Sequence, residues 1–262
     1  MSLPIFSFSE PITDPEVLES IKALPTEDDL PYDDGEPMET ARHREQMQIL
    51  IESLQIHWAE RTDYYVGGNM FIHYDPENKR HSRGPDFFLV LDVDQRERKS
   101  WVVWWEAMRF PEVIIELLSD TTREIDKGEK KTLYERLFRT PEYYLYDPFS
   151  QEFVGYHVQD GRYQEIHPDA AHTIASGVTG LSLGIRAGWL RWLTTEGVVI
   201  PTPRELAEQE RQRAEQERQR AEQERQRAEQ ANRQALEALE RAAQAEQLLA
   251  AYRRRFGELE ER

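Results

Sequence analysis

A strict repeat of seven residues dominates the last third of the chain. The heptad AEQERQR occurs three times without a change, beginning at Ala207, Ala214 and Ala221, and its register continues to residue 256. Apart from Asn232 and Gly257, this stretch contains residue types that favour a helix or are neutral. The repeat therefore predicts one long charged helix over residues 204–262. Prolines at positions 201 and 203 place a domain boundary near residue 200.

The repeat is only partly suited to a coiled coil, which needs two apolar seam positions in each heptad. In the first three heptads, the second seam position, three residues after the alanine, is a glutamate. After residue 228 this position is an alanine or a tyrosine. One interpretation is a solvated single helix with modest self-association through its apolar residues, and the other is a continuous oligomerising coil. The apolar residues in question are Leu236, Leu239, Leu248, Leu249 and Tyr252.

Charge and composition limit the function of the 262-residue chain. Its net charge of −17 argues against a protein that coats nucleic acid, and residues 1–40 alone carry eleven acids against Lys22. The absence of cysteine excludes disulfides, thiolate metal sites and a cysteine nucleophile, and it favours the cytoplasm. No apolar run approaches the ~20 residues of a membrane span, so we expect no membrane partner. The predicted organisation is an acidic segment 1–40, a domain 41–200 and the helix 204–262.

Hydrophobic periodicity predicts an α/β fold for residues 41–200, with a mixed β-sheet core flanked by helices. An amphipathic pattern predicts a first helix over 40–59, with Met47, Leu50, Leu54 and Trp58 on one stripe. A second helix is predicted over 125–138. The predicted strands are 69–74, 86–93, 101–105, 112–118, 143–146, 152–157, 163–166, 181–185 and 189–193.

Three charged residues interrupt these apolar patterns. Glu116 lies within the run VIIELL, where an unpaired carboxylate would cost several kcal/mol. Asp86 precedes the apolar run FFLVL, although a turn aspartate after Gly84-Pro85 is an equal interpretation. On a helical wheel, Lys130 falls at the centre of the apolar face formed by residues 133, 134, 137 and 138. An intrahelical pair with Asp126, its lysine reaching to water, is the alternative for Lys130.

Two acids on adjacent strands and a converging lysine suit phosphodiester hydrolysis. Carboxylate oxygens are preferred ligands of Mg²⁺, and Mn²⁺ is the alternative ion. A bound metal polarises a phosphoryl oxygen and lowers the pKa of water, while an ammonium group orients that water or stabilises developing charge. The combination of Asp86, Glu116 and Lys130 thus predicts a metal-dependent hydrolase.

Four motifs extend this reading, and they occur in the order GPDFFLVLDV, PEVIIELLSDTT, DKGEKKTLY and PEYYLYDP between residues 84 and 148. With these motifs the sequence resembles the putative restriction endonuclease domain family of the Uma type, a branch of the PD-(D/E)XK nuclease superfamily, over about 170 residues. The resemblance implies a restriction-endonuclease-like fold, a DNA substrate, metal ligands at Asp86 and Glu116, and a lysine that activates water. The residue two beyond Glu116 is Leu118 rather than lysine, and Lys130 matches the helical lysine of this branch.

Four further residues are candidate accessory groups. Ser119 and Asp126 match positions typical of the family, where they would bond to metal-bound water or hold Lys130. Glu39 and His43 lie at the start of the first helix, where related nucleases often place an extra carboxylate, but a surface role is the favoured interpretation for both. The alternative for Asp126 is an N-terminal helix residue that interacts only with the helix dipole.

The leading hypothesis is a Mg²⁺-dependent endonuclease that hydrolyses DNA phosphodiester bonds. An acidic domain repels DNA unless the basic segments 79–83, 96–99 and 127–131 gather on one face. The alternative is a catalytically inert nuclease-like domain that acts as an interaction protein and forms a homo-oligomer through residues 204–262. A buried Glu116–Lys130 salt bridge without catalysis is the third interpretation, and it leaves Asp86 unexplained.

Overall fold

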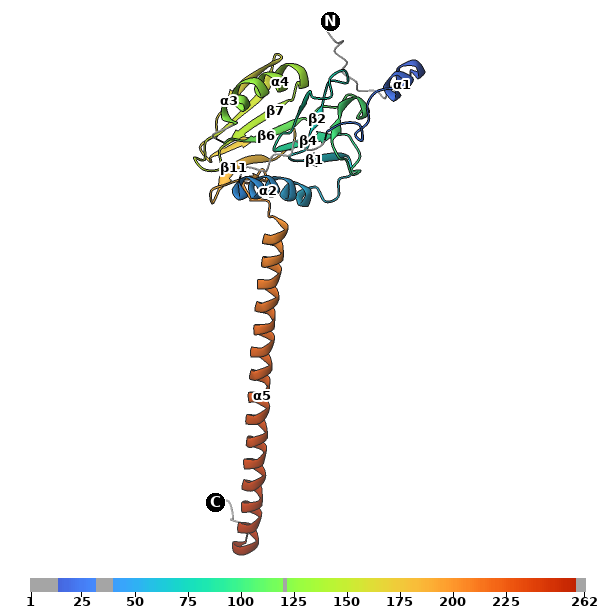
Figure 1. The fold of residues 1–262 in the computed structure, drawn as a ribbon. Helices are drawn as coiled ribbons and strands as arrows, with labels where there is room; N and C mark the ends of the chain where they lie inside the picture. Colours follow the sequence, from blue (N-terminus) through green and yellow to red (C-terminus); the bar gives the residue numbers. More distant parts are fainter. Residues whose placement is uncertain (1–13, 32–39, 120–121, 258–262) are drawn as a thin grey trace. The chain divides into compact units, whose positions relative to one another are not determined.

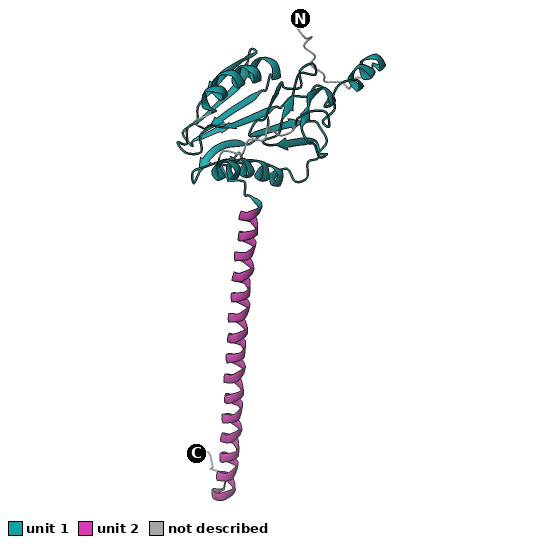
Figure 2. Cartoon of the chain, in the orientation of Figure 1, with its two compact units in different colours: residues 1–203 teal, residues 204–262 magenta. Residues whose placement is uncertain are grey.

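The computed structural model describes residues 14–31, 40–119 and 122–257. The chain divides into two compact units, Met1–Pro203 and Arg204–Arg262 (Figure 2). The second unit is helix α5 (Pro203–Phe256), as the heptad repeat predicts. Every side chain described between residues 207 and 255 is exposed. In the described part of the chain, no helix combines the length and the apolar character needed to cross a bilayer.

The first unit is built on a six-stranded mixed sheet with the strand order β1-β4-β6-β7-β8-β9 (Figure 1). Only β6 and β7 pair in parallel, while the other neighbours in this sheet are antiparallel. The strands of this sheet are β1 (Tyr64–Gly67), β4 (Phe87–Leu91), β6 (Val113–Leu117), β7 (Glu142–Tyr146), β8 (Phe153–Gln159) and β9 (Arg162–Ile166). The sheet and its flanking helices confirm the predicted α/β class.

Two smaller sheets and several helices complete the unit. One sheet has the order β10-β11-β12 and the other the order β3-β2-β5. Their strands are β2 (Ile72–His73), β3 (Ser82–Arg83), β5 (Trp101–Val102), β10 (Thr173–Ala175), β11 (Ser182–Arg186) and β12 (Trp189–Leu193). The helical elements are α1 (Pro15–Lys22), α2 (Ala41–His57), η1 (Val103–Trp105), α3 (Arg123–Ile125), η2 (Asp126–Lys130), α4 (Lys131–Leu133) and η3 (Tyr134–Phe138).

The main sheet is buried on both faces, so each of its central strands contributes to two cores. Phe87 and Ile115 pack in the core that includes α2 and the β10-β11-β12 sheet. Phe88 and Ile114 pack in the second core, under the helical segment that follows β6 (Figure 1). Because successive side chains of a strand point to opposite faces, Glu116 lies on the same side as Ile114. The strand pattern thereby directs this carboxylate toward residues 123–138.

Helix α2 confirms the first predicted helix and is fixed by specific bonds. Its N-cap is Thr40, whose hydroxyl accepts a hydrogen bond from the backbone N–H of His43 at 3.1 Å. The buried Gln46 amide makes two 2.9 Å bonds with the backbone of Leu190 in β12. Loss of such a buried amide would leave backbone groups unsatisfied, so these bonds set the position of the helix. The N-terminal turn of α2 thus lies at a fixed place against the sheet.

The second predicted helix forms, but it is not a regular α-helix. Residues 123–138 comprise α3, the π-helical turn η2, α4 and the π-helical turn η3. A π turn is wider than an α turn and rotates the residues that follow it. Tyr134 and Phe138 are buried, whereas Leu137, predicted on the apolar face, is 42% exposed. The buried stripe is therefore narrower than the helical wheel predicts.

Two predicted strands are shorter in the structure. The segment 69–74 contributes only β2, and the segment 101–105 turns into the 3-10 helix η1 after β5. The indole N–H groups of Trp104 and Trp105 both donate to the carbonyl of Pro25, at 2.9 and 2.7 Å. Tertiary contacts with residues near Pro25 thus accompany the turn and override the strand propensity of the tryptophans. The sequence analysis also missed α1, β1, β3 and β10.

Candidate active site

Asp86 and Glu116 meet where two antiparallel strands lie side by side. Phe87 of β4 pairs with Ile115 of β6, so Asp86, one residue before β4, comes opposite Glu116. The Asp86 Oδ2 atom accepts a 2.7 Å hydrogen bond from the backbone N–H of Leu117. This bond fixes the carboxylate of Asp86 beside the end of β6. The two acids that the sequence separates by thirty positions therefore share one site.

A glycine allows the chain to pass close to this strand end. A Cβ atom at Gly68, just after β1, would lie 2.5 Å from the backbone oxygen of Asp86 and 2.8 Å from Met47 Sδ. Such distances are well inside van der Waals contact, so a larger residue would displace Asp86 or α2. The glycine thus maintains the backbone position from which Asp86 reaches Leu117.

Lys130 approaches Glu116 from the helical segment. Its Nζ atom lies 3.1 Å from Glu116 Oε2 and 2.8 Å from Asp126 Oδ1. The side chain of Lys130 is 15% exposed, so it does not extend to bulk water as the alternative interpretation expected. The predicted Asp126–Lys130 pair is present, and it holds the ammonium group against Glu116. Asp86, Glu116, Asp126 and Lys130 form what we call the acidic cluster.

Tyr134 is a member of this site that the sequence analysis treated only as part of an apolar face. Its hydroxyl donates a 2.9 Å hydrogen bond to Glu116 Oε1, and the side chain is completely buried. Tyr143 packs edge-on against Tyr134 and donates a 2.9 Å bond to the backbone carbonyl of Asp126. The sequence feature that could have indicated this role is the position of Tyr134, one helical turn after Lys130. The two tyrosines therefore position Glu116 and the turn that carries Lys130.

Burial dominates the electrostatics of Glu116, which is only 1% exposed. Burial raises the pKa of Glu116 to about 8; Lys130 opposes this shift, while Asp86 and Asp126 add to it. Burial also raises the pKa of Asp126, against the effect of Lys130. Burial disfavours the ammonium form, but the charges of Glu116 and Asp126 outweigh it and raise the pKa of Lys130. Lys130 is therefore a permanent cation at neutral pH, in a cluster with an excess of carboxyl groups.

The remaining predicted residues differ in their distance from the cluster. His43 is buried in the first turn of α2, with Nε2 3.6 Å from Asp86 Oδ1. The hydroxyl of Ser119 lies 3.0 Å from that of Thr122 and accepts a 3.2 Å bond from the Thr122 backbone N–H. Ser119 thus helps to form the turn between β6 and the helical segment. Glu39 lies outside the described residues.

The predicted basic segments are not all gathered around the cluster. Arg83 pairs with Glu129, which brings the segment 79–83 beside the segment 127–131 that carries Lys130. The segment 96–99 lies elsewhere and is neutralised by acids, because buried Arg98 bonds with Asp94 and Glu106. Two of the three segments therefore adjoin each other next to the acidic cluster, and the third is part of a separate ion-pair network.

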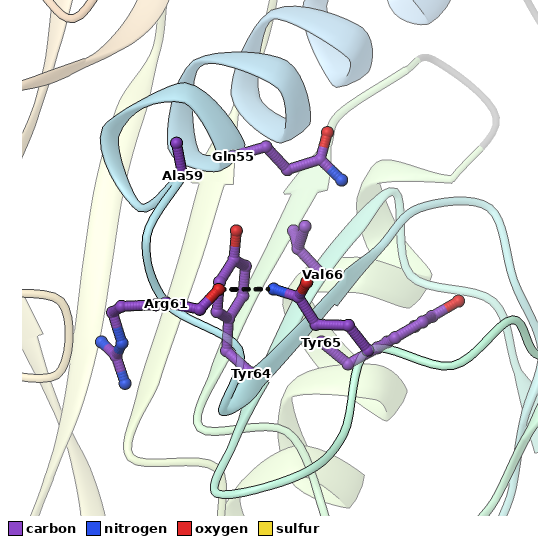
Figure 3. Close-up of a pocket in the computed structure, with 7 residues that line it drawn as sticks. Gln55, Ala59, Arg61, Tyr64, Tyr65 and Val66 are labelled. Atoms are coloured by element: carbon purple, nitrogen blue, oxygen red, sulfur yellow. Dashed lines mark hydrogen bonds between the residues drawn. The ribbon is translucent and has the colours of Figure 1, made fainter.

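A separate cavity at the edge of the sheet is not part of this site. It has a volume of about 290 Å³ and adjoins the first residues of β1 (Figure 3). Two of its lining residues are joined by a 3.0 Å hydrogen bond from the Gln95 amide to the Arg61 carbonyl (Figure 3). Tyr64, which lines this cavity, pairs with Leu91 at the end of β4 away from Asp86. The cavity and the acidic cluster therefore lie at opposite ends of β4.

The donor set of the acidic cluster fits a hard divalent cation. Carboxylate oxygens are the side-chain ligands that Mg²⁺ prefers, and Mg²⁺ usually keeps several waters and takes only one or two protein carboxylates. Asp86 and Glu116 are the two carboxylates of the cluster that could hold such a cation. Among the described residues, no group of three or more histidine, aspartate or glutamate side chains is placed so that it could hold a metal ion. A site with two protein ligands and water is the arrangement that this chemistry favours.

Comparison with known proteins identifies the family. Residues 16–194 match the family described as Uma2, putative restriction endonuclease, so the chain belongs to this family. The chain is also similar to a crystal structure described as a putative nuclease belonging to DUF820 from Anabaena variabilis. That likeness has 16% sequence identity and a TM-score of 0.42, and it covers 62% of this chain and 89% of the other. No curated protein matches the chain closely enough to count as a relative.

Proposed function

We propose that this chain is a Mg²⁺-dependent endonuclease that hydrolyses DNA phosphodiester bonds, with Mn²⁺ as a substitute ion. The observation that carries the proposal is the acidic cluster, in which two acids come from neighbouring strand ends and a lysine that is 15% exposed lies 3.1 Å from Glu116. A purely structural salt bridge needs one acid for one base. The cluster has three carboxyl groups around one ammonium group, and this surplus of carboxyl groups favours a cation, whose binding would release the proton that burial keeps on Glu116.

Asp86 and Glu116 would hold the metal, which when bound would polarise a phosphoryl oxygen and lower the pKa of a water molecule. Asp86 is already oriented by the backbone N–H of Leu117, and Glu116 by the hydroxyl of Tyr134. Preorganised ligands need little rearrangement, which is the main contribution a protein makes to such a site. The rigidity of both acids therefore supports their role as metal ligands.

Lys130 would act as a hydrogen-bond donor and not as a base. Because the neighbouring carboxylates raise the pKa of Lys130, its ammonium group keeps its protons at neutral pH. It can then orient the attacking water and stabilise the charge that develops on the phosphate. Asp126, 2.8 Å away, holds the ammonium group in place. The water oxygen would form a bond to phosphorus as the bond to the leaving oxygen breaks; the water would release its proton to solvent, and solvent would supply one to the leaving oxygen.

Arg83 and Lys127 support DNA as the substrate, because they lie next to the cluster. Lys127 is now paired with Glu152 at 2.6 Å, and Arg83 with Glu129. Both acids are on the surface, so a phosphate could replace them at little cost. Phosphate contacts of this kind are screened by salt, and we expect cleavage to weaken as salt concentration rises.

A cytoplasmic location stays a prediction of the sequence.

The experiment combines metal binding with plasmid cleavage by the full chain. Calorimetric titration with Mg²⁺ or Mn²⁺ is followed by incubation with supercoiled plasmid. Asp86→Asn should lose both metal binding and nicking. Asp92→Asn is the matched control, because Asp92 stands at the other end of β4 and pairs with Arg109 at 2.7 Å. We expect this control to behave as the wild type does.

A second pair of variants separates binding from catalysis. Lys130→Met should keep metal binding but lose cleavage by about 100-fold or more, the usual cost of one oriented charge donor. Lys131→Met should cleave normally, because Lys131 lies over the ring of Tyr156 at 3.7 Å. A wild type that binds neither ion, or an Asp86→Asn variant that cleaves at the normal rate, would refute the proposal. The inert interaction protein would then be the better interpretation.

A further inference from the structure

The distal half of α5 carries large apolar side chains that are exposed to solvent. Leu239 and Leu248 are 68% and 75% exposed, and Leu249 and Tyr252 are 53% and 55% exposed. Burial of one leucine side chain contributes roughly 1.5–3 kcal/mol to the free energy of association. Four large apolar side chains on one stretch of helix therefore favour association. In the preceding stretch of the helix, residues 207–227, the only apolar residue type is alanine. The exposed apolar area is therefore confined to the distal half.

The heptad register places these side chains on one stripe. Leu249 and Tyr252 are the last described members of a seam with the spacing of coiled-coil a and d positions. Leu239 and Leu248 occupy the e and g positions that flank it. We define the distal seam as Ala228, Ala231, Ala235, Ala238, Ala242, Ala245, Leu249 and Tyr252. The alanines allow a second helix to approach closely, so that the flanking leucines also become buried.

Charges beside the distal seam favour a second copy in parallel orientation. In a parallel pair a g position faces the e position five residues later on the other helix. Arg241 then faces Glu246 of the second copy, and this ion pair forms twice. In the antiparallel pairing of the same segment, Arg241 faces Arg241 of the second copy and Arg227 faces Arg255. Like charges at these positions are destabilising.

The proximal half of α5 opposes the same contact. Its seam carries Glu210, Glu217 and Glu224, which would face their own copies in a parallel pair. The flanking positions would bring Arg213 against Arg218 of the second copy, and the next heptad repeats this repulsion. In the single helix all three glutamates are exposed to solvent. Contact between two chains is thus favoured after residue 228 and disfavoured before it.

We propose that residues 228–252 of α5 pair with the same residues of a second copy as a parallel, in-register, two-stranded coiled coil, while residues 207–227 remain unpaired. This pairing develops the first interpretation of the repeat, a solvated helix that self-associates through its apolar residues, and it replaces the continuous coil. The pairing does not depend on the proposed nuclease activity. It would give an assembly with two acidic clusters.

Sedimentation of the full chain tests the association. We expect a monomer–dimer equilibrium within about 1 to 100 μM, the range of weak specific contacts. Leu249→Glu, in the distal seam, should shift the chain to monomer across this range. Ala214→Glu, at the equivalent heptad position of the proximal half, should leave the dimer unchanged. A monomeric wild type at 100 μM, or equal weakening by both substitutions, would overturn the proposal.

Disulfide formation tests the orientation, because the chain has no cysteine of its own. Ala231→Cys places a thiol in the distal seam, where a parallel pair brings the two sulfurs together. In the antiparallel pairing, residue 231 faces residue 249, and the two thiols would be about 27 Å apart along the axis. Arg233→Cys, on the outer face two residues away, is the control. Equal or absent crosslinking in both variants would exclude the parallel pair even if a dimer forms.

Discussion

Glu116→Gln should remove the pH dependence that the buried carboxyl group imposes on stability. The ordinary pKa of this group is 4.5, and burial raises the pKa of Glu116 to about 8 in the folded protein. Between these values the folded protein keeps a proton that the unfolded chain releases. Stability therefore falls as the pH rises through this window, by roughly 1 to 2 kcal/mol for each pH unit.

The total effect is large compared with the stability of a normal domain. A pKa raised from 4.5 to about 8 corresponds to on the order of 5 kcal/mol at pH values above 8. The amide of glutamine is neutral at every pH and has almost the same shape as the carboxyl group. We expect wild type and Glu116→Gln to differ by about 1 kcal/mol at pH 5. At pH 9 without metal, the variant should be several kcal/mol more stable.

Urea unfolding in the presence of a chelator measures this difference. All six tryptophans lie in the first unit, so their fluorescence reports unfolding of that unit without a contribution from α5. Glu77→Gln, on an exposed loop, controls for the loss of one negative charge. If the difference in free energy of unfolding between wild type and Glu116→Gln stays the same from pH 5 to pH 9, burial does not hold a proton on Glu116. The electrostatic account of the acidic cluster would then be wrong.

Two further substitutions test the groups that position the acids. Tyr134→Phe removes the 2.9 Å hydrogen bond to Glu116 without changing the packed ring. We expect the free energy of unfolding, measured with urea, to fall by about 1 to 3 kcal/mol at pH 9 and by less at pH 5. The loss is larger at pH 9 because a hydrogen bond to a charged acceptor is the stronger one. An equal loss at both pH values would show that the hydroxyl does not stabilise the carboxylate. Gly68→Ala places a Cβ 2.5 Å from the Asp86 backbone oxygen, so Asp86 must move. We expect calorimetry to show weaker Mg²⁺ binding and the free energy of unfolding to fall by about 1 to 3 kcal/mol. Unchanged metal binding would mean that Asp86 does not depend on this close approach.

Several features of the site were predictable from local patterns. A charged residue inside an apolar strand identified Glu116, and a lysine on the same side of a helix as buried aromatic residues identified Lys130. The structure places Lys130 Nζ 3.1 Å from Glu116 Oε2. Tyr134 was not identified as a polar partner, because a tyrosine in an apolar stripe gives no indication of where its hydroxyl points. The exposure of Leu137 was also missed, because helical periodicity assumes regular α turns and this segment contains π turns.

By itself, the sequence determined the long helix that follows residue 203 and the faces on which most strand residues lie. These properties follow from periods of two and seven that each element carries within itself. Only the tertiary structure decided that β4 pairs with β6, which brings Asp86 beside Glu116, and that the basic segment 96–99 is neutralised by Asp94 and Glu106. Pairing between distant segments depends on the packing of the whole sheet, and no local pattern specifies it.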